Sequence, residues 1–76
     1  MSADLSHVPI GESAIIRGFT DEEISLKLIE LGCIPGTRIT MIRKAPLGDP
    51  IAFACSGSLI SIRLLEASTV LVEDHA

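Results

Sequence analysis

At 76 residues, the chain has room for one small domain, which we assign to residues 1–76 with a core at about 5–73 and a tail at 74–76. Hydrophobic residues make up 47% of it, which excludes an intrinsically disordered chain, and its formal net charge of −4 lacks the basic footprint of a nucleic-acid-binding protein. With two Phe and no Trp or Tyr, it also lacks the aromatic side chains on which single-stranded bases stack, so we expect no nucleic acid as a partner.

Two segments precede the first predicted helix. Leu5–Pro9 is expected to dock against the domain, and the Pro and Gly near residue 10 are typical of a turn. Ser13–Arg17 is predicted as the first strand because it holds two adjacent β-branched residues. Gly18 is expected to bend or end that strand, since glycine weakens a strand interior.

A helix is predicted over Asp21–Leu31. Thr20 can cap its free backbone N–H groups, and Glu23 can reach back to the cap, which is the arrangement of a capping box. Three apolar residues recur at helical spacing and are expected to form the buried stripe of the helix: Ile24, Leu28 and Leu31. Gly32 is expected to end the helix, because glycine readily adopts the left-handed conformation found there.

The second half of the chain alternates short strands with turns. Strands are predicted at 37–44, 51–55, 59–63 and 69–73. Pro35–Gly36 fits a type II turn, Ser56–Ser58 a tight hairpin connection, and 64–68 a single helical turn. Ala45–Pro50 holds two Pro and one Gly and is predicted as a loop. Five short strands with one early helix predict a mainly β fold, a small barrel whose closure removes exposed strand edges.

The sequence shows no membrane or secretion signal. Met1–Pro9 has neither the basic start nor the apolar run of a signal peptide. No stretch approaches the roughly 20 apolar residues that cross a bilayer. Cys33 and Cys55 stand among apolar residues, as is typical of buried thiols in a reducing compartment, although one disulfide between them stays open. We expect a cytoplasmic protein that does not insert directly into a membrane.

Three parts of the chain resemble motifs of the FeoA family. They are Leu28–Gly32 with Ile34–Thr37, Ala45–Ile51, and Ile62–Arg63 with Glu66–Ala67, in this order along nearly the whole chain. The resemblance implies a small SH3-like five-stranded barrel with one α-helix inserted after the first strand and a short helical turn before the last strand. It also implies a non-catalytic accessory role in ferrous-iron uptake beside FeoB, a membrane transporter with a cytosolic GTP-binding domain. No metal-ligand motif comes with the resemblance.

The loop over residues 45–50 is the first candidate partner-binding site. Its Pro and Gly residues are those of a rigid connector between two strands, an interpretation that needs no partner. A stiff loop also loses little freedom on binding, so it suits recognition, with Leu47 exposed at its tip. The candidate partner-binding residues of this loop are Pro46, Leu47, Gly48 and Asp49.

Two residues of the predicted helix form the second candidate site. Leu26 and Ile29 lie off the narrow apolar stripe of the helix. They either widen its buried face or leave an exposed apolar patch, and such patches often mark partner sites. FeoB, or a second copy of the chain in a homo-oligomer, would cover that patch.

No catalytic residues and no metal ligands are predicted. The chain has no Gly-rich phosphate loop and no metalloprotease or serine-hydrolase motif, so we predict that it is not an enzyme. Structural zinc ligands come in close pairs, which His7, His75, Cys33 and Cys55 do not form. We predict no resident cofactor and leave weak or indirect association with Fe²⁺ open. The alternative function is a Fe²⁺-binding sensor or carrier domain. Binding of Pro-rich peptides is disfavoured, because their grooves are lined by aromatic residues.

Overall fold

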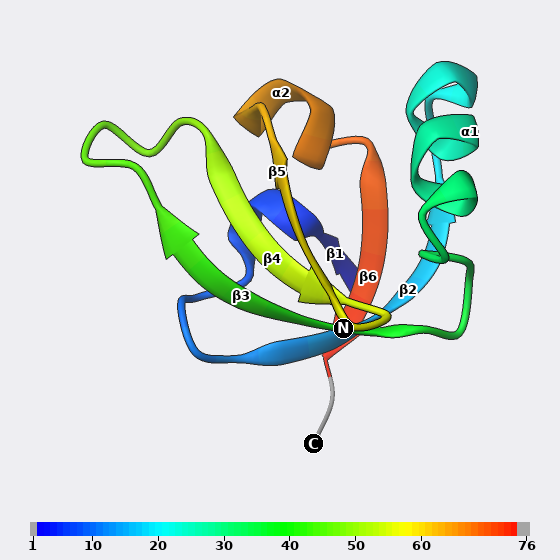
Figure 1. Cartoon of the computed structure of the whole chain (residues 1–76), viewed down its shortest axis with the longest axis horizontal. Coiled ribbons are helices and arrows are strands. Elements are labelled where there is room, and N and C mark those ends of the chain that lie inside the picture. The colour runs from blue at the N-terminus through cyan, green and yellow to red at the C-terminus, as the bar shows by residue number, and fades with distance from the viewer. Residues whose placement is uncertain (1, 75–76) are drawn as a thin grey trace.

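The computed structural model describes residues 2–74 and consists of one antiparallel sheet with two short α-helices (Figure 1). The strands are β1 (Ser2–Asp4), β2 (Ser13–Phe19), β3 (Arg38–Lys44), β4 (Ile51–Cys55), β5 (Ser58–Ile62) and β6 (Val70–Asp74). Their order across the sheet is β1-β6-β2-β3-β4-β5. The helices are α1 (Glu22–Glu30) and α2 (Leu64–Ala67), and a 3-10 helix spans Leu5–His7.

The core lies inside the curved sheet. On β4, Ile51, Phe53 and Cys55 are all buried, as expected for alternate residues on one strand face. On β5, Ile60 and Ile62 point the same way. Burying a side chain of this size contributes roughly 1.5–3 kcal/mol to folding, so these alternating positions largely set the register of both strands.

Two irregularities bend the longer strands. The register of β2 against β6 shifts between Ile16 and Gly18, next to the glycine that was expected to bend or end the strand, and β2 continues to Phe19. The register of β3 against β4 shifts between Met41 and Arg43. An extra residue in one strand increases the local bend and twist. The two bulges therefore let one short sheet wrap around its core.

The mainly β fold is confirmed, with one strand more than predicted. β1 pairs with β6, and its Ser2 lies opposite Glu73, so it depends on a partner from the far end of the chain. The predicted helix after the first strand consequently follows β2. The expected closure of the sheet is not found within residues 2–74, where the hydrogen-bonded ladder stays open with β1 and β5 as its edges. Of the predicted tail, Asp74 is the last residue of β6, and residues 75 and 76 lie outside the described residues.

The helix α1 differs from its prediction at both ends. Asp21, not Thr20, is the N-cap, and its Oδ1 accepts a hydrogen bond from Ile24 N–H at 3.0 Å. Thr20 is instead held by Thr69, whose carbonyl accepts from Thr20 N–H at 2.8 Å. The prediction that Leu31 is buried was wrong: it follows the last helical residue and is 47% exposed.

The two predicted tight turns are present. Thr37 N–H donates to Ile34 O at 3.0 Å, and Gly36 has φ of 95°, which matches a type II turn. Between β4 and β5, Ser56 and Gly57 both have positive φ, 51° and 78°, as a two-residue type I′ hairpin requires. This second turn fixes the pairing of β4 with β5.

Candidate partner-binding surface

The loop between β3 and β4 projects from one side of the molecule (Figure 1). It is closed by hydrogen bonds of its own: Gly48 N–H donates to Ala45 O at 2.7 Å, and Ala45 N–H donates to Pro50 O at 2.9 Å. Pro46 is the second residue of the resulting turn, where its fixed φ is favourable. Leu47 follows it and is 96% exposed. The loop thus holds an apolar side chain in solvent on a preorganised backbone.

Asp49 connects this loop to α2. Its Oδ1 accepts a hydrogen bond at 2.9 Å from the N–H of Leu64, the first residue of α2. The first N–H groups of a helix have no partner inside the helix, so this carboxylate satisfies one of them. Among the predicted loop residues, Asp49 therefore has an identified structural contact, which sets the position of the loop relative to α2.

Two surface hollows flank Leu65, which is 81% exposed. One of about 390 Å³ lies toward the loop and is lined by Ser6, Asp49, Leu64, Leu65 and Ser68. The other, of about 210 Å³, lies between α2 and the start of α1 and is lined by Asp21, Glu23, Ile24, Leu65, Glu66 and Thr69. Leu65 could not be singled out from the sequence, because a single helical turn is too short for periodicity to show which Leu faces outward.

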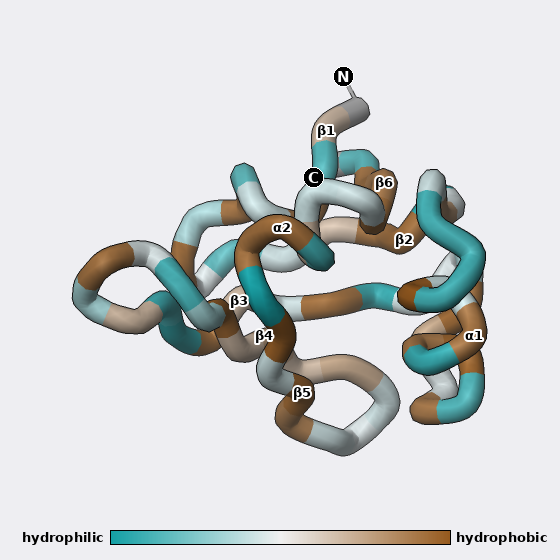
Figure 2. Tube along the Cα trace, turned by 90° about the horizontal axis from the view of Figure 1, so that it is seen from above, coloured by the Kyte–Doolittle hydropathy of each residue, from teal (hydrophilic) through white to brown (hydrophobic). Residues whose placement is uncertain are grey.

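The outer face of α1 carries the second predicted pair. Leu26 is 57% exposed and Ile29 is 42% exposed, whereas Ile24 and Leu28 on the opposite face are buried. The pair therefore leaves an apolar patch and does not widen the buried face. α1 and the 45–50 loop lie on opposite sides of the molecule, with α2 between them (Figures 1 and 2). The structure does not bring the two predicted groups into one surface.

Cys33 and Cys55 are both buried and are free thiols. Burial, together with a hydrogen bond and charge interaction with Cys55, raises the pKa of Cys33 to about 12. Only a thiolate is a strong nucleophile or metal ligand, so Cys33 stays protonated and unreactive at neutral pH. The thiols pack as small apolar groups, as the sequence predicts.

The family of the chain follows from comparison with known proteins. A model of the FeoA domain matches residues 3–74. The chain belongs to the FeoA family. The FeoA-like protein of Clostridium acetobutylicum is 33% identical with a TM-score of 0.87, and the match covers 99% of this chain and 88% of that one. The FeoA protein of Chlorobium tepidum is 32% identical with a TM-score of 0.89, covering 96% and 70%.

A third similar structure, also of a FeoA protein, is named for its fold. The zinc complex of FeoA from Stenotrophomonas maltophilia, called a procaryotic SH3 domain protein, is 28% identical with a TM-score of 0.79, covering 92% of this chain and 88% of that one. The SH3-like fold is therefore confirmed. A manganese-dependent transcriptional repressor matches with a TM-score of 0.87 at 13% identity, over 37% of its length, and shares the fold alone. No curated protein matches the chain.

Across residues 2–74, no group of three or more His, Cys, Asp or Glu side chains is placed to hold a metal ion. His7 Nδ1 lies 3.1 Å from Asp4 Oδ1 near the surface, and His75 lies outside the described residues. In this part of the chain, neither helix combines the length and apolar character that crossing a bilayer requires.

Proposed function

We propose that this FeoA-family protein is a non-catalytic, cytoplasmic accessory protein of ferrous-iron uptake that docks on a cytosolic region of the FeoB transporter. Membership of a family associated with ferrous-iron transport supports the process. The observation that carries the docking proposal is Leu47, 96% exposed on a loop that is closed by its own hydrogen bonds. The docking uses no cofactor of its own.

The proposed contact surface combines the loop with α2. Leu47 and Leu65 are the two most exposed large apolar side chains among the described residues, and the 390 Å³ hollow lies between the loop and α2. Asp49 joins these two elements through Leu64 N–H, so a partner meets them in a fixed arrangement. Little conformational freedom is then lost on binding, which favours affinity.

Leu47→Ala tests the docking. Full burial of a Leu side chain is worth roughly 1.5–3 kcal/mol, so partial loss of that contact should weaken binding about tenfold. The measurement is calorimetric titration of the folded variant with soluble cytosolic regions of FeoB. Ile10→Ala is the matched control, because Ile10 is an exposed apolar residue outside the loop and α2. Wild-type affinity in Leu47→Ala, or no binding of the wild-type protein to any of these regions, would refute the proposal.

A further inference from the structure

β5 is an edge strand, and its free side faces away from the sheet. It pairs with β4 on one side, and within residues 2–74 no strand pairs with its other side. Figure 2 shows it at the border of the molecule. Ile60 and Ile62 anchor it in the core, so this free edge is held in place by the same side chains that stabilise the fold.

The hairpin turn determines which backbone groups of β5 face outward. Cys55 and Ser58 flank the two-residue turn and lie opposite each other, so they form a hydrogen-bonded pair. Hydrogen-bonded and non-bonded pairs alternate along an antiparallel ladder, so Ile60 also bonds to β4. Leu59 and Ser61 therefore direct their N–H and C=O groups away from β4. In the described part of the chain, no other segment forms a backbone hydrogen bond with either residue.

This edge lacks the features that usually prevent strand pairing. Such features are charged side chains, Pro, bulges and very short strands. β5 has the sequence SLISI, with no charge and no Pro, and its register with β4 is regular over five pairs. The other edge, β1, has only three residues and ends in Asp4. β5 is thus the edge suited to receive another strand, and Leu59, 59% exposed, offers an apolar contact on it.

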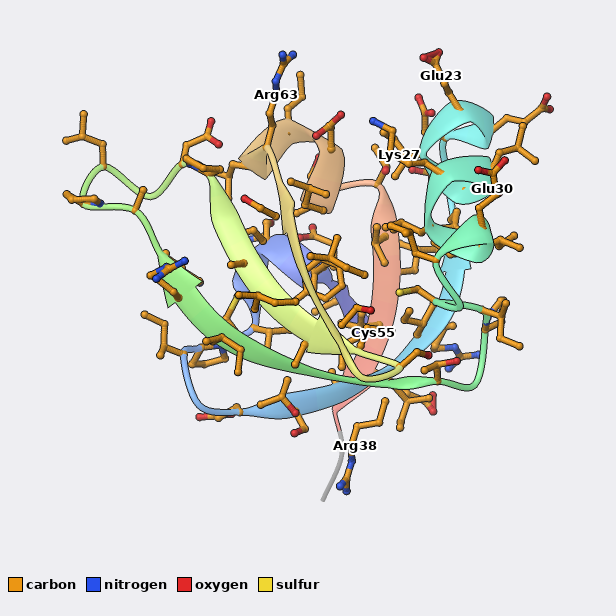
Figure 3. All side chains as sticks on the ribbon, viewed as in Figure 1. Glu23, Lys27, Glu30, Arg38, Cys55 and Arg63 are labelled. Carbon is orange, nitrogen blue, oxygen red and sulfur yellow. The ribbon has the colours of Figure 1, made fainter. Side chains whose placement is uncertain are left out.

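The hollow between α2 and α1 lies at the C-terminal end of this edge. α2 follows β5 after a single residue, Arg63, whose side chain points out of the molecule in Figure 3. The 210 Å³ hollow combines apolar Ile24 and Leu65 with three carboxylates: Asp21, which caps α1, Glu23 of α1 and Glu66 of α2. A Lys or Arg side chain fits this chemistry, because its methylene stem packs on apolar groups while its charge meets carboxylates.

We propose that β5 receives an extended segment of a partner protein as an added strand, with a Lys or Arg of that segment seated in the acid-rimmed hollow. The backbone of Leu59 and Ser61 supplies the hydrogen bonds, as in other cases of strand addition. This mode needs none of the aromatic residues that bind Pro-rich peptides. The inference does not depend on FeoB being that partner.

Charge favours a partner segment over a second copy of this chain. In a symmetric antiparallel β5–β5 pair, each C-terminal end lies beside the hairpin turn of the other copy. Arg63, the nearest basic residue to β5, would then lie at the Ser56–Gly57 end, away from the hollow. β5 itself contains no basic residue, so the strand of a second copy brings no Lys or Arg to the hollow.

Selection from a library of random peptides of about eight residues, long enough to cover a typical strand, tests the proposal. The probes are the selected peptides, synthesised and titrated into the labelled protein by NMR. We expect them to be enriched in Lys or Arg, to shift the amides of Leu59 and Ser61 most, and to slow the hydrogen exchange of both amides. N-methylation of alternate peptide residues should weaken binding about tenfold, because it removes ladder hydrogen bonds.

A pair of matched variants tests the role of charge. Glu23→Lys reverses a charge that lines the hollow, and Glu22→Lys makes the same change one residue earlier, outside its lining. Glu23→Lys should weaken peptide binding severalfold, and Glu22→Lys should leave it near wild type. Failure to select any peptide, shifts centred elsewhere, or equal effects of both variants would overturn the inference. Concentration-dependent shifts of Leu59 and Ser61 without peptide would also overturn it and identify a second copy as the occupant.

Discussion

Asp49→Ala separates the structural role of the loop from direct contact with a partner. Asp49 lies 15 residues before Leu64 in sequence, yet its Oδ1 accepts the first N–H of α2 at 2.9 Å. The substitution leaves that N–H to water and releases the end of the loop from α2. We therefore expect a loss of stability together with weaker docking, even though Leu47 itself is unchanged.

The size of the effect follows from the kind of contact. Replacing a side chain that caps a helix N-terminus by Ala costs about 0.5–2 kcal/mol, and this site is exposed, so water can partly replace the bond. We expect a loss of about 1 kcal/mol, which lowers the Tm of a domain of this size by about 4–8 °C. Leu47→Ala should change stability by less than about 0.5 kcal/mol, because it alters a side chain outside the core.

Chemical and thermal denaturation of Leu47→Ala, Asp49→Ala and Asp49→Asn measure these changes in stability. Asp49→Asn keeps an oxygen that can accept from Leu64 N–H, so it should retain most of the stability and docking that Asp49→Ala loses. Amide relaxation should show greater motion of Leu47 in Asp49→Ala alone. Equal melting of Asp49→Ala and wild type, or equal losses in the Ala and Asn variants, would refute the role assigned to this hydrogen bond.

Two further predictions concern the buried thiols and the turn after α1. The pKa of Cys33 is raised from 9.0 to about 12, so between these pH values the folded chain keeps a proton that the unfolded chain loses. The free energy of unfolding should therefore fall as the pH rises through this range, by about 2 kcal/mol at pH 10.5. Cys33→Ala should flatten this dependence in urea titrations at several pH values, and an unchanged slope would contradict the assignment. Gly32→Ala should lower the stability of the domain more than Gly11→Ala, as measured by denaturation. Both glycines have positive φ, 91° and 88°, but of the two only Gly32 would place its new Cβ against another group, Ser56 at 3.2 Å. Equal losses would show that the contact with Ser56 costs nothing.

The sequence predicts those parts of the fold whose causes are local. The 51–55 strand agrees with β4 because its apolar residues alternate and turn residues bound it on both sides. The hairpin at Ser56–Gly57 is equally local, since it needs only two residues with positive φ. β1 could not be predicted from Ser2–Asp4, because the strand exists through its pairing with β6 at the far end of the chain.

The candidate surface shows the same division. An exposed Leu47 follows from its position between Pro46 and Gly48, and the exposure of Leu26 follows from helical spacing. The hydrogen bond from Leu64 to Asp49 joins elements that only the tertiary fold brings together. The exposure of Leu65 depends on how α2 packs, so this exposure could not be predicted from the sequence either.

The pairing of β1 with β6 brings the two ends of the domain together. Ser2 lies opposite Glu73 across neighbouring strands, so both ends leave the same corner of the sheet. Chain ends that lie this close tolerate circular permutation and insertion into other proteins. A host protein could therefore carry the domain as an insertion in a surface loop, joined by two adjacent linkers. The 45–50 loop and the β5 edge would stay accessible.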